Sequence, residues 1–273
     1  MNENPMPQEG AAPKKKPTKM ILGLLVILVV AAAVVFAMTR QEPEPPTPPA
    51  TEPPITEASE VPVETGATEP TMLEHMAALY AQNADIVGWI RIDDTKLDYP
   101  VMYTPDDEEK YLHANFEGKV DYAGLPFIDK DCSMDPESQN LILYGHNMKN
   151  GTAFKTIMSY ENEKFWEEHP TIYYSTLYEE RTYEVIAAFR DRVYEKTEDC
   201  FKFYQFIDPA TEEEFNGAIS YFKENTPYDI EATAEYGDKL ITLVTCAYHT
   251  RRGRFVVVAR EITPPAEAET VAG

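Results

Sequence analysis

A thiol and a guanidinium flank one short loop near the C-terminal end of the sequence. Cys246 follows the apolar run Leu240–Val244, and Arg254 comes just before a second apolar run, Phe255–Val258. Two strands that leave and enter a short loop would hold a nucleophile and its electrostatic partner on a rigid platform. A buried core thiol is the other interpretation of Cys246, because free cysteine is among the most buried residue types.

An imidazole occupies a similar place at the end of another predicted strand. His146 follows the apolar run Leu141–Tyr144 and a glycine. A thiol is mostly protonated near neutral pH, so a nucleophilic cysteine needs a base or a nearby cation. His146 is therefore the predicted proton-transfer partner of Cys246. The remaining histidines are predicted to be surface or packing residues: His75, His113, His169 and His249.

An arginine beside these two groups would have a further use. Attack on an amide creates an oxyanion, and losing one donor to it typically costs about 2.7–4 kcal/mol in the barrier. Arg254 is predicted to be this donor, or a clamp on the substrate. Arg251 and Arg252 are interpreted as ordinary charges flanking a strand, although residue type alone does not separate the three.

Short apolar or alternating runs predict a β-rich body from residue 71 onward. The predicted strands are 89–92, 97–101, 141–144, 182–189, 240–244 and 255–258, and the first two form a hairpin. Helical spacing of apolar residues appears in Thr71–Ile86, in the segment after Asn150-Gly151 and in Thr211–Asn225, the last with a capping-box start. We expect one domain with these elements.

The first 70 residues have a different composition. Met20–Met38 is an unbroken apolar run of 19 residues, which as a helix would rise about 28 Å and span a bilayer core of about 30 Å. Lysines precede it, while residues 41–70 contain no Lys or Arg, so the positive-inside rule predicts a cytoplasmic N-terminus. A cleaved signal peptide is the alternative, because small alanines lie within the run.

The predicted organisation follows from these composition changes. It comprises a basic cytoplasmic N-terminus (1–19), a transmembrane signal anchor (20–39), a Pro- and Glu-rich disordered stalk (40–70), a catalytic domain (71–263) and a disordered tail (264–273). This organisation predicts a single-pass protein of the cell membrane with its catalytic domain outside the cell.

Charge and cysteine content narrow the possible partners. The residues after 40 hold 19 basic and 45 acidic side chains, a difference of −26. A field of this sign disfavours nucleic acids and other polyanions, and it either attracts cationic amines or serves only solubility. Three cysteines are an odd number, so at least one thiol is left over, whether Cys132 and Cys200 form a bridge or both stay free.

Several motifs, in the right order, make the chain resemble sortases, and within them class B. The Thr-Leu-x-Thr-Cys signature appears as Thr242–Cys246, and Arg254 matches the arginine that opens a Val-rich strand. The histidine motif is Tyr144–Met148. Further similar segments are Trp89–Asp93, Leu97–Val101 and Asn115–Gly118. The resemblance covers about residues 72–262.

The resemblance implies a mainly β (α+β) fold, a closed eight-stranded barrel with an N-terminal helix and an additional helix before the last strands. It also implies a cysteine transpeptidase. Cys246 would attack the threonine carbonyl of a sorting signal and hold a thioacyl intermediate until an amine resolves it. His146 would protonate the leaving amine and deprotonate the incoming one, and Arg254 would steady the oxyanion.

The expected ligands follow from the same resemblance. The substrates would be secreted proteins bearing a C-terminal Pro-x-Thr-Gly/Asn-like sorting signal, and the acceptor would be an amine of a peptidoglycan precursor. Thr245, Tyr248 and Asn147 are the expected substrate-binding residues. We expect no metal or other cofactor, no nucleic acid, and contact with the membrane through the N-terminal helix.

Two alternatives remain open at this level. One is a membrane-tethered binding or scaffold protein on the same fold, in which the thiol is structural. The other is a pilus-polymerising sortase, which joins protein to protein. Such enzymes usually carry a lid segment and a C-terminal membrane helix, whereas the tail Pro264–Gly273 is short and polar.

Overall fold

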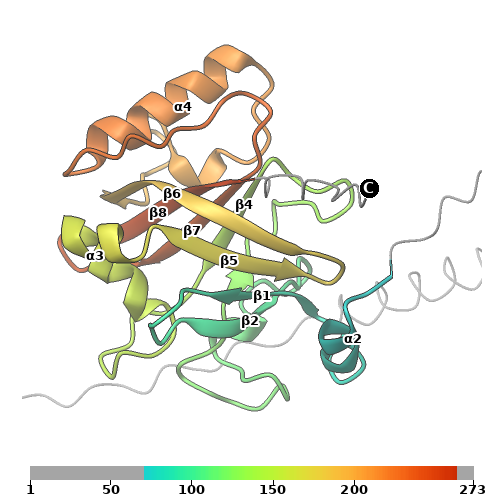
Figure 1. Ribbon diagram of the computed structural model, residues 1–273. Helices are drawn as coiled ribbons and strands as arrows, with labels where there is room; N and C mark the ends of the chain where they lie inside the picture. The colour runs from blue at the N-terminus through green and yellow to red at the C-terminus, as the bar shows by residue number, and fades with distance from the viewer. Residues whose placement is uncertain (1–70, 263–273) are drawn as a thin grey trace, which may run out of the picture. The chain divides into compact units, whose positions relative to one another are not determined.

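The structure is a computed structural model that describes residues 71–262 (Figure 1). The predicted cytoplasmic segment, anchor, stalk and tail lie outside these residues, so they stay predictions. Within the described part of the chain, no helix has both the length and the apolar character needed to cross a bilayer.

Eight strands within residues 71–262 close into a barrel, in the order β1-β2-β3-β4-β7-β8-β6-β5. They are β1 (Ile86–Arg91), β2 (Asp98–Met102), β3 (Phe127–Ile128), β4 (Asn140–Tyr144), β5 (Thr171–Thr176), β6 (Glu180–Arg192), β7 (Leu240–Cys246) and β8 (Gly253–Glu261). The barrel closes where β1 pairs with β5. β4 and β7, about a hundred residues apart in the chain, run parallel as neighbours. The predicted fold class is confirmed.

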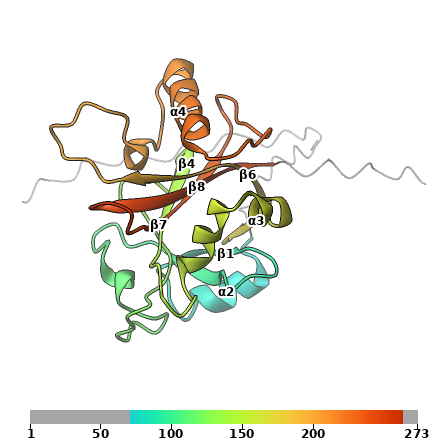
Figure 2. The ribbon, with the colours of Figure 1, turned by 90° about the vertical axis from the view of Figure 1, so that its left-hand side faces the viewer.

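The strands β7 and β8 are covered on both faces. Residues Leu240–Thr245 and Phe255–Ala259 are buried without interruption. The 3-10 helix η2 (Phe154–Glu161) packs against both strands, and α4 (Glu212–Asn225) packs against β6 (Figure 2). A strand covered on both faces has a continuous apolar run instead of an alternating one. The strand ends that carry the thiol and the guanidinium therefore stand on the core of the molecule.

Two of the predicted helices form with adjusted ends. α2 (Glu74–Tyr80) is shorter than the predicted Thr71–Ile86, because Ile86 is already the first residue of β1. α4 begins after Thr211, whose hydroxyl accepts a hydrogen bond from the Glu214 amide at 3.2 Å, as the capping-box pattern predicts. Its apolar stripe is buried: Phe215, Ala218, Ile219 and Phe222.

Other elements differ from the sequence prediction. The segment predicted to be helical after Asn150-Gly151 forms a 3-10 helix, and β3, β5 and the short helix α3 (Glu163–Glu168) were not predicted. β3 has only two residues, too few for any periodicity, and it exists because Phe127 pairs with Met102 on one side and Tyr144 on the other.

The three cysteines are free thiols. Cys132 is buried, Cys200 is exposed, and Cys246 is half-buried. Burial raises the pKa of Cys132 to about 12, so this thiol stays protonated. Cys132 and Cys200 therefore form no disulfide bridge with each other, and both remain free.

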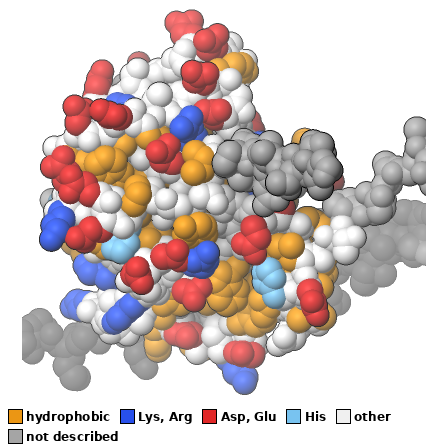
Figure 3. Space-filling model, viewed as in Figure 1, with side chains coloured by type: hydrophobic (Ala, Val, Ile, Leu, Met, Phe, Trp, Pro, Cys, Tyr) orange, Lys and Arg blue, Asp and Glu red, His pale blue; other side chains and the backbone are white. Residues whose placement is uncertain are grey.

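Acidic side chains gather over α4 on the face shown in Figure 3. The exposed glutamates of this helix include Glu212, Glu213 and Glu214 in its first turn. Negative charge at a helix N-terminus interacts favourably with the helix dipole. The acidic residues in the first turn therefore help to stabilise α4, in addition to making the surface negative.

Candidate active site

The parallel pairing of β4 and β7 brings the predicted thiol and imidazole to the same end of the barrel. Tyr144 lies opposite Val244 in the register, and His146 and Cys246 each follow two positions later. Three hydrogen bonds continue the contact beyond the ladder. They run from Gly145 N to Val244 O at 3.1 Å, from Thr245 Oγ1 to Gly145 O at 2.6 Å, and from Asn147 Nδ2 to Cys246 O at 2.7 Å.

The glycine before the histidine is required by close packing. A Cβ at position 145 would lie 2.5 Å from the Phe154 ring, nearer than real Cβ contacts come. Phe154 is fully buried, and its amide donates to the His146 carbonyl at 2.9 Å. The 3-10 helix η2 thus fixes the backbone of the histidine from behind.

Arg254 lies beside the thiol on the neighbouring strand. It is the register partner of Cys246 in the β7–β8 ladder. Its guanidinium donates to the carbonyl of Gly253 at 3.1 Å, and no carboxylate of residues 71–262 lies within ion-pair distance of it. Arg252 instead pairs with Glu195 at 2.8 Å, and Arg251 is exposed.

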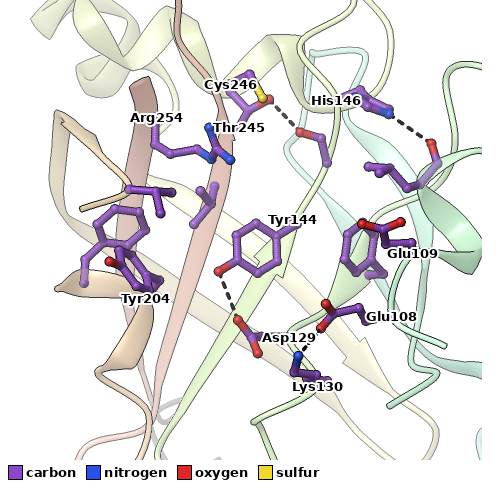
Figure 4. A pocket seen from close by; sticks show the side chains of 16 residues that line it. Glu108, Glu109, Asp129, Lys130, Tyr144, His146, Tyr204, Thr245, Cys246 and Arg254 are labelled. Carbon is purple, nitrogen blue, oxygen red and sulfur yellow. Dashed lines mark hydrogen bonds and ion pairs between the residues drawn. The ribbon is translucent and has the colours of Figure 1, made fainter. Parts of the chain in front are cut away.

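All three groups line one cavity of about 430 Å³ (Figure 4). Arg254 is the only one of the three neighbouring arginines in this lining. The other lining residues are Glu108, Glu109, Leu112, Phe127, Asp129, Lys130, Tyr144, Gly145, Val193, Phe203, Tyr204, Val244 and Thr245. Cys246 and His146 thus stand at the rim of the barrel, at one opening, beside a guanidinium.

A backbone carbonyl determines which nitrogen of the histidine carries a proton. His146 Nε2 lies 2.9 Å from Leu112 O. A carbonyl oxygen only accepts, so Nε2 bears the hydrogen and donates it. Within the described residues no hydrogen bond occupies Nδ1, so this nitrogen is available to exchange a proton. His113, predicted to be a surface or packing residue, stacks on this ring with centroids 5.5 Å apart.

Tyr144 and Asp129 form a hydrogen-bonded pair in the cavity lining. The Tyr144 hydroxyl donates to Asp129 Oδ2 at 3.0 Å. Burial raises the pKa of Asp129, and the bonds from the Asp131 amide and the Tyr144 hydroxyl only partly offset it. Burial, and then the Asp129 carboxylate, raise the pKa of Tyr144, so its hydroxyl stays protonated. The cation next in sequence, Lys130, pairs with Glu108.

The expected substrate-binding residues lie in different environments. Thr245 lines the cavity, but it is buried and its hydroxyl is bonded to Gly145 O. Asn147 is not part of the lining, and its amide holds the carbonyl of Cys246. Tyr248 is 82% exposed and also stands outside the lining. Their contact with substrate stays a prediction.

Sequence reasoning did not find several lining residues. Leu112 acts through its backbone carbonyl, which every residue has, so its side-chain type carries no signal. Asp129 and Tyr144 meet only because β3 pairs with β4. Glu108 and Glu109 lie in an acidic run that resembles any solvated surface segment.

Comparison with known proteins agrees with this geometry. A family model described as the sortase domain matches residues 90–262. The chain belongs to the sortase family. Sortase B of Listeria monocytogenes is 31% identical over 192 residues, which cover 70% of this chain and 75% of that protein.

Solved structures of sortase B have the same fold. The Staphylococcus aureus sortase B–substrate complex is 28% identical with a TM-score of 0.63, and the match covers 70% of this chain and 86% of that one. A sortase B complexed with triglycine is 28% identical with a TM-score of 0.61, covering 68% and 85%. This sortase is thus a cysteine transpeptidase similar to class B.

Proposed function

We propose that this sortase cleaves a C-terminal Pro-x-Thr-Gly/Asn-like sorting signal after threonine and transfers the protein to an amine of a cell-wall peptidoglycan precursor. The observation that carries the proposal is the cavity shared by Cys246, His146 and Arg254. Cys246 comes from β7, His146 from the loop after β4, and Arg254 from β8. The sorting signal and the amine are inferred from the resemblance of the motifs to class B.

In the acylation step, His146 Nδ1 takes the proton of the Cys246 thiol, and the resulting thiolate attacks the threonine carbonyl carbon. The tetrahedral intermediate collapses, the threonine C–N bond breaks, and the leaving amine takes a proton from His146 Nδ1. The product is a thioester on Cys246. Because Nε2 is held on Leu112 O, the ring presents Nδ1 alone for this transfer.

Arg254 stabilises the charge that develops on the carbonyl oxygen. The guanidinium has no carboxylate partner among the described residues, so its remaining N–H groups are open to an oxyanion. Arg251 and Arg252 are outside the cavity lining, and Arg252 is already paired with Glu195. These placements favour Arg254 over both neighbours.

In the second step an amine attacks the thioester. His146 Nδ1 accepts the proton of the incoming amine, the new C–N bond forms, and the Cys246 thiolate leaves. A similar sortase B has been solved in complex with triglycine, a peptide that ends in a free amine. For this chain, we infer an acceptor amine of the cell wall.

The direct test is an acyl-enzyme assay with sorting peptides. Incubation with a Pro-x-Thr-Gly or Pro-x-Thr-Asn peptide is expected to add the acyl fragment to the intact mass of the enzyme, and added amines should release it. Cys246→Ala should abolish the adduct, while Cys200→Ala, which removes the exposed thiol, should keep it. No adduct with any peptide would instead support the binding or scaffold role.

The acceptor distinguishes the second alternative. Peptidoglycan-type amines are expected to release the acyl group faster than a lysine side chain within a folded protein. A preference for the protein lysine would favour the pilus-polymerising role. Both arms use the same preformed thioester, so the comparison isolates the second step.

We also propose that residues 20–39 anchor the enzyme with its N-terminus in the cytoplasm and the catalytic domain outside. The support is the apolar run and the lysines before it. Protease added to intact cells is expected to degrade the catalytic domain. Recovery of the domain free in the medium, lacking the first 40 residues, would favour a cleaved signal peptide.

A further inference from the structure

Two consecutive residues of the segment between β2 and β3 contact the imidazole of His146. They follow one another at the end of the short 3-10 helix η1 (Lys110–Leu112). The Leu112 carbonyl accepts the Nε2 hydrogen at 2.9 Å, and the His113 ring stacks on the imidazole at an interplanar angle of 22°. One contact sets the in-plane direction of the ring and the other covers one of its faces.

We propose that Leu112 and His113 form a clamp that orients His146, and that an anchor of Asp85, Tyr111 and Asn83 holds this clamp in place. These are positioning residues, because the contacts that carry the proposal act through His146. The catalytic consequence rests on the proposed function, whereas the orientation of the ring does not.

The anchor joins η1 to the turn between α2 and β1. Tyr111 is 1% exposed, and its hydroxyl donates to Asp85 Oδ2 at 2.7 Å while accepting from Asn83 Nδ2 at 2.7 Å. Lys110 pairs with the same Asp85 carboxylate. Burial raises the pKa of Asp85, but the bonds from Lys110 and Tyr111 outweigh it and leave the pKa below its usual value. Asp85 is therefore charged and bonded at neutral pH.

The other side of the clamp is closed by the loop that follows it. The Asp121 amide donates to His113 O, and the Leu125 amide donates to Tyr111 O, both at 2.9 Å. Gly124 lies directly against the clamp backbone at φ +58°. A Cβ there would overlap Tyr111 O and come within 2.6 Å of Leu112 O. A larger residue at position 124 must displace the carbonyl that holds His146.

The chain offers one matched control for a substitution at Gly124 and another for a substitution at Tyr111. Gly118 lies in the same loop with φ +73°, but a Cβ there meets no atom within 4 Å, so Gly118→Ala carries the backbone strain without the displacement. Tyr160 is fully buried, and its hydroxyl donates to His169 O at 2.7 Å. Tyr160→Phe therefore removes a comparable buried hydrogen bond away from the clamp.

The first readout is independent of catalysis. The full chain in detergent micelles, with ring-¹⁵N histidine, should show a Nε2-bound proton on His146 that exchanges slowly with water, assigned by its loss in His146→Gln. Gly124→Ala and Tyr111→Phe are expected to speed this exchange about tenfold or more, since the hydrogen bond is lengthened or lost. His113→Ala should do so less, and His113→Phe should restore the wild-type signal because it keeps a flat ring.

The second readout is turnover with a sorting peptide. Gly124→Ala is expected to lower kcat by about 10- to 100-fold with KM changed less than about threefold, because misplacing a catalytic group by about an ångström costs that much. Gly118→Ala and Tyr160→Phe should leave kcat and KM within about twofold of the wild-type values. If Gly124→Ala does not fold, Tyr111→Phe and His113→Ala decide the outcome.

The two readouts separate the two proposals. Unchanged His146 exchange in Tyr111→Phe, Gly124→Ala and His113→Ala overturns the clamp, even if melting temperatures fall. Equal effects of the control variants overturn it as well. Altered exchange in a protein that forms no acyl-enzyme with any peptide supports the clamp and overturns the proposed function alone.

Discussion

At the end of the barrel where β4 and β7 begin, Arg181 is bonded to Glu137 at 2.7 Å and to Glu179 at 2.6 Å. At the end where these two strands stop, Arg254 has no carboxylate of the described residues within ion-pair distance. Asp191, its register partner on β6, is bonded by the hydroxyls of Tyr194 and Tyr221 instead.

The difference shows what each end is built for. Arg181 and Glu137 are only 14% and 17% exposed, so their charges satisfy one another in a largely desolvated place. At the cavity, neither the Arg254 cation nor the Asp129 carboxylate has an ion-pair partner among the described residues. Uncompensated charge lowers stability, but it leaves donors and acceptors free for a ligand.

The largest effect is expected at the imidazole. His146→Ala should lower acylation by about 10³-fold or more, nearly as much as Cys246→Ala, because proton transfer and thiol activation fail together. Single-turnover measurement of the acyl-enzyme checks this. His169→Ala is the control, since its ring packs against Phe165 away from the cavity. An active His146→Ala enzyme would remove the imidazole from the mechanism.

The unpaired arginine comes next. Arg254→Ala should lower kcat by about 10²- to 10³-fold, as loss of an oxyanion donor does. Arg251→Ala and Arg252→Ala should stay within about threefold, because neither side chain lines the cavity. Steady-state kinetics on the three variants provides the comparison. Equal losses at all three would show that the cluster acts only through its total charge.

The paired end should respond in stability and not in turnover. Glu137→Gln leaves Arg181 without its buried partner and is expected to lower the free energy of unfolding by about 2–3 kcal/mol. Glu198→Gln, at the more exposed pair with Arg192, should lower it clearly less, because water screens that pair. Urea denaturation measures both. A fall in kcat of Glu137→Gln under conditions where the variant is fully folded would contradict the division between the two ends.

The smallest effect concerns the buried carboxylate of the cavity. The pKa of Asp129 is higher in the folded protein than in the unfolded chain. The free energy of unfolding therefore decreases as pH rises and the Asp129 carboxyl ionises. Asp129→Asn is therefore expected to raise the melting temperature at neutral pH, with the gain vanishing as pH falls below the usual range of aspartate.

Asp85→Asn is the control of opposite sign. The folded protein lowers the pKa of Asp85, so its contribution is present at neutral pH and is lost as pH falls through that pKa. This variant should melt lower at neutral pH, with the deficit shrinking in acid. The same sign of change for both variants would contradict the different environments of the two carboxylates.

The sequence by itself determined the elements that carry the chemistry. The apolar runs of β4, β7 and β8 end next to His146, Cys246 and Arg254, and a strand covered on both faces must be apolar throughout. The capping box and apolar stripe likewise predicted α4. These are local patterns, readable because side-chain periodicity follows backbone geometry.

Only the tertiary structure decided how these pieces meet. The parallel register of β4 with β7 joins residues a hundred positions apart. The antiparallel register of β7 with β8 places Arg254, and neither Arg251 nor Arg252, opposite Cys246. The carbonyl of Leu112 that orients His146 has no counterpart in residue type, since every residue has a backbone carbonyl. Charge pairing and burial at Asp129 depend in the same way on neighbours that the chain brings together only when it folds.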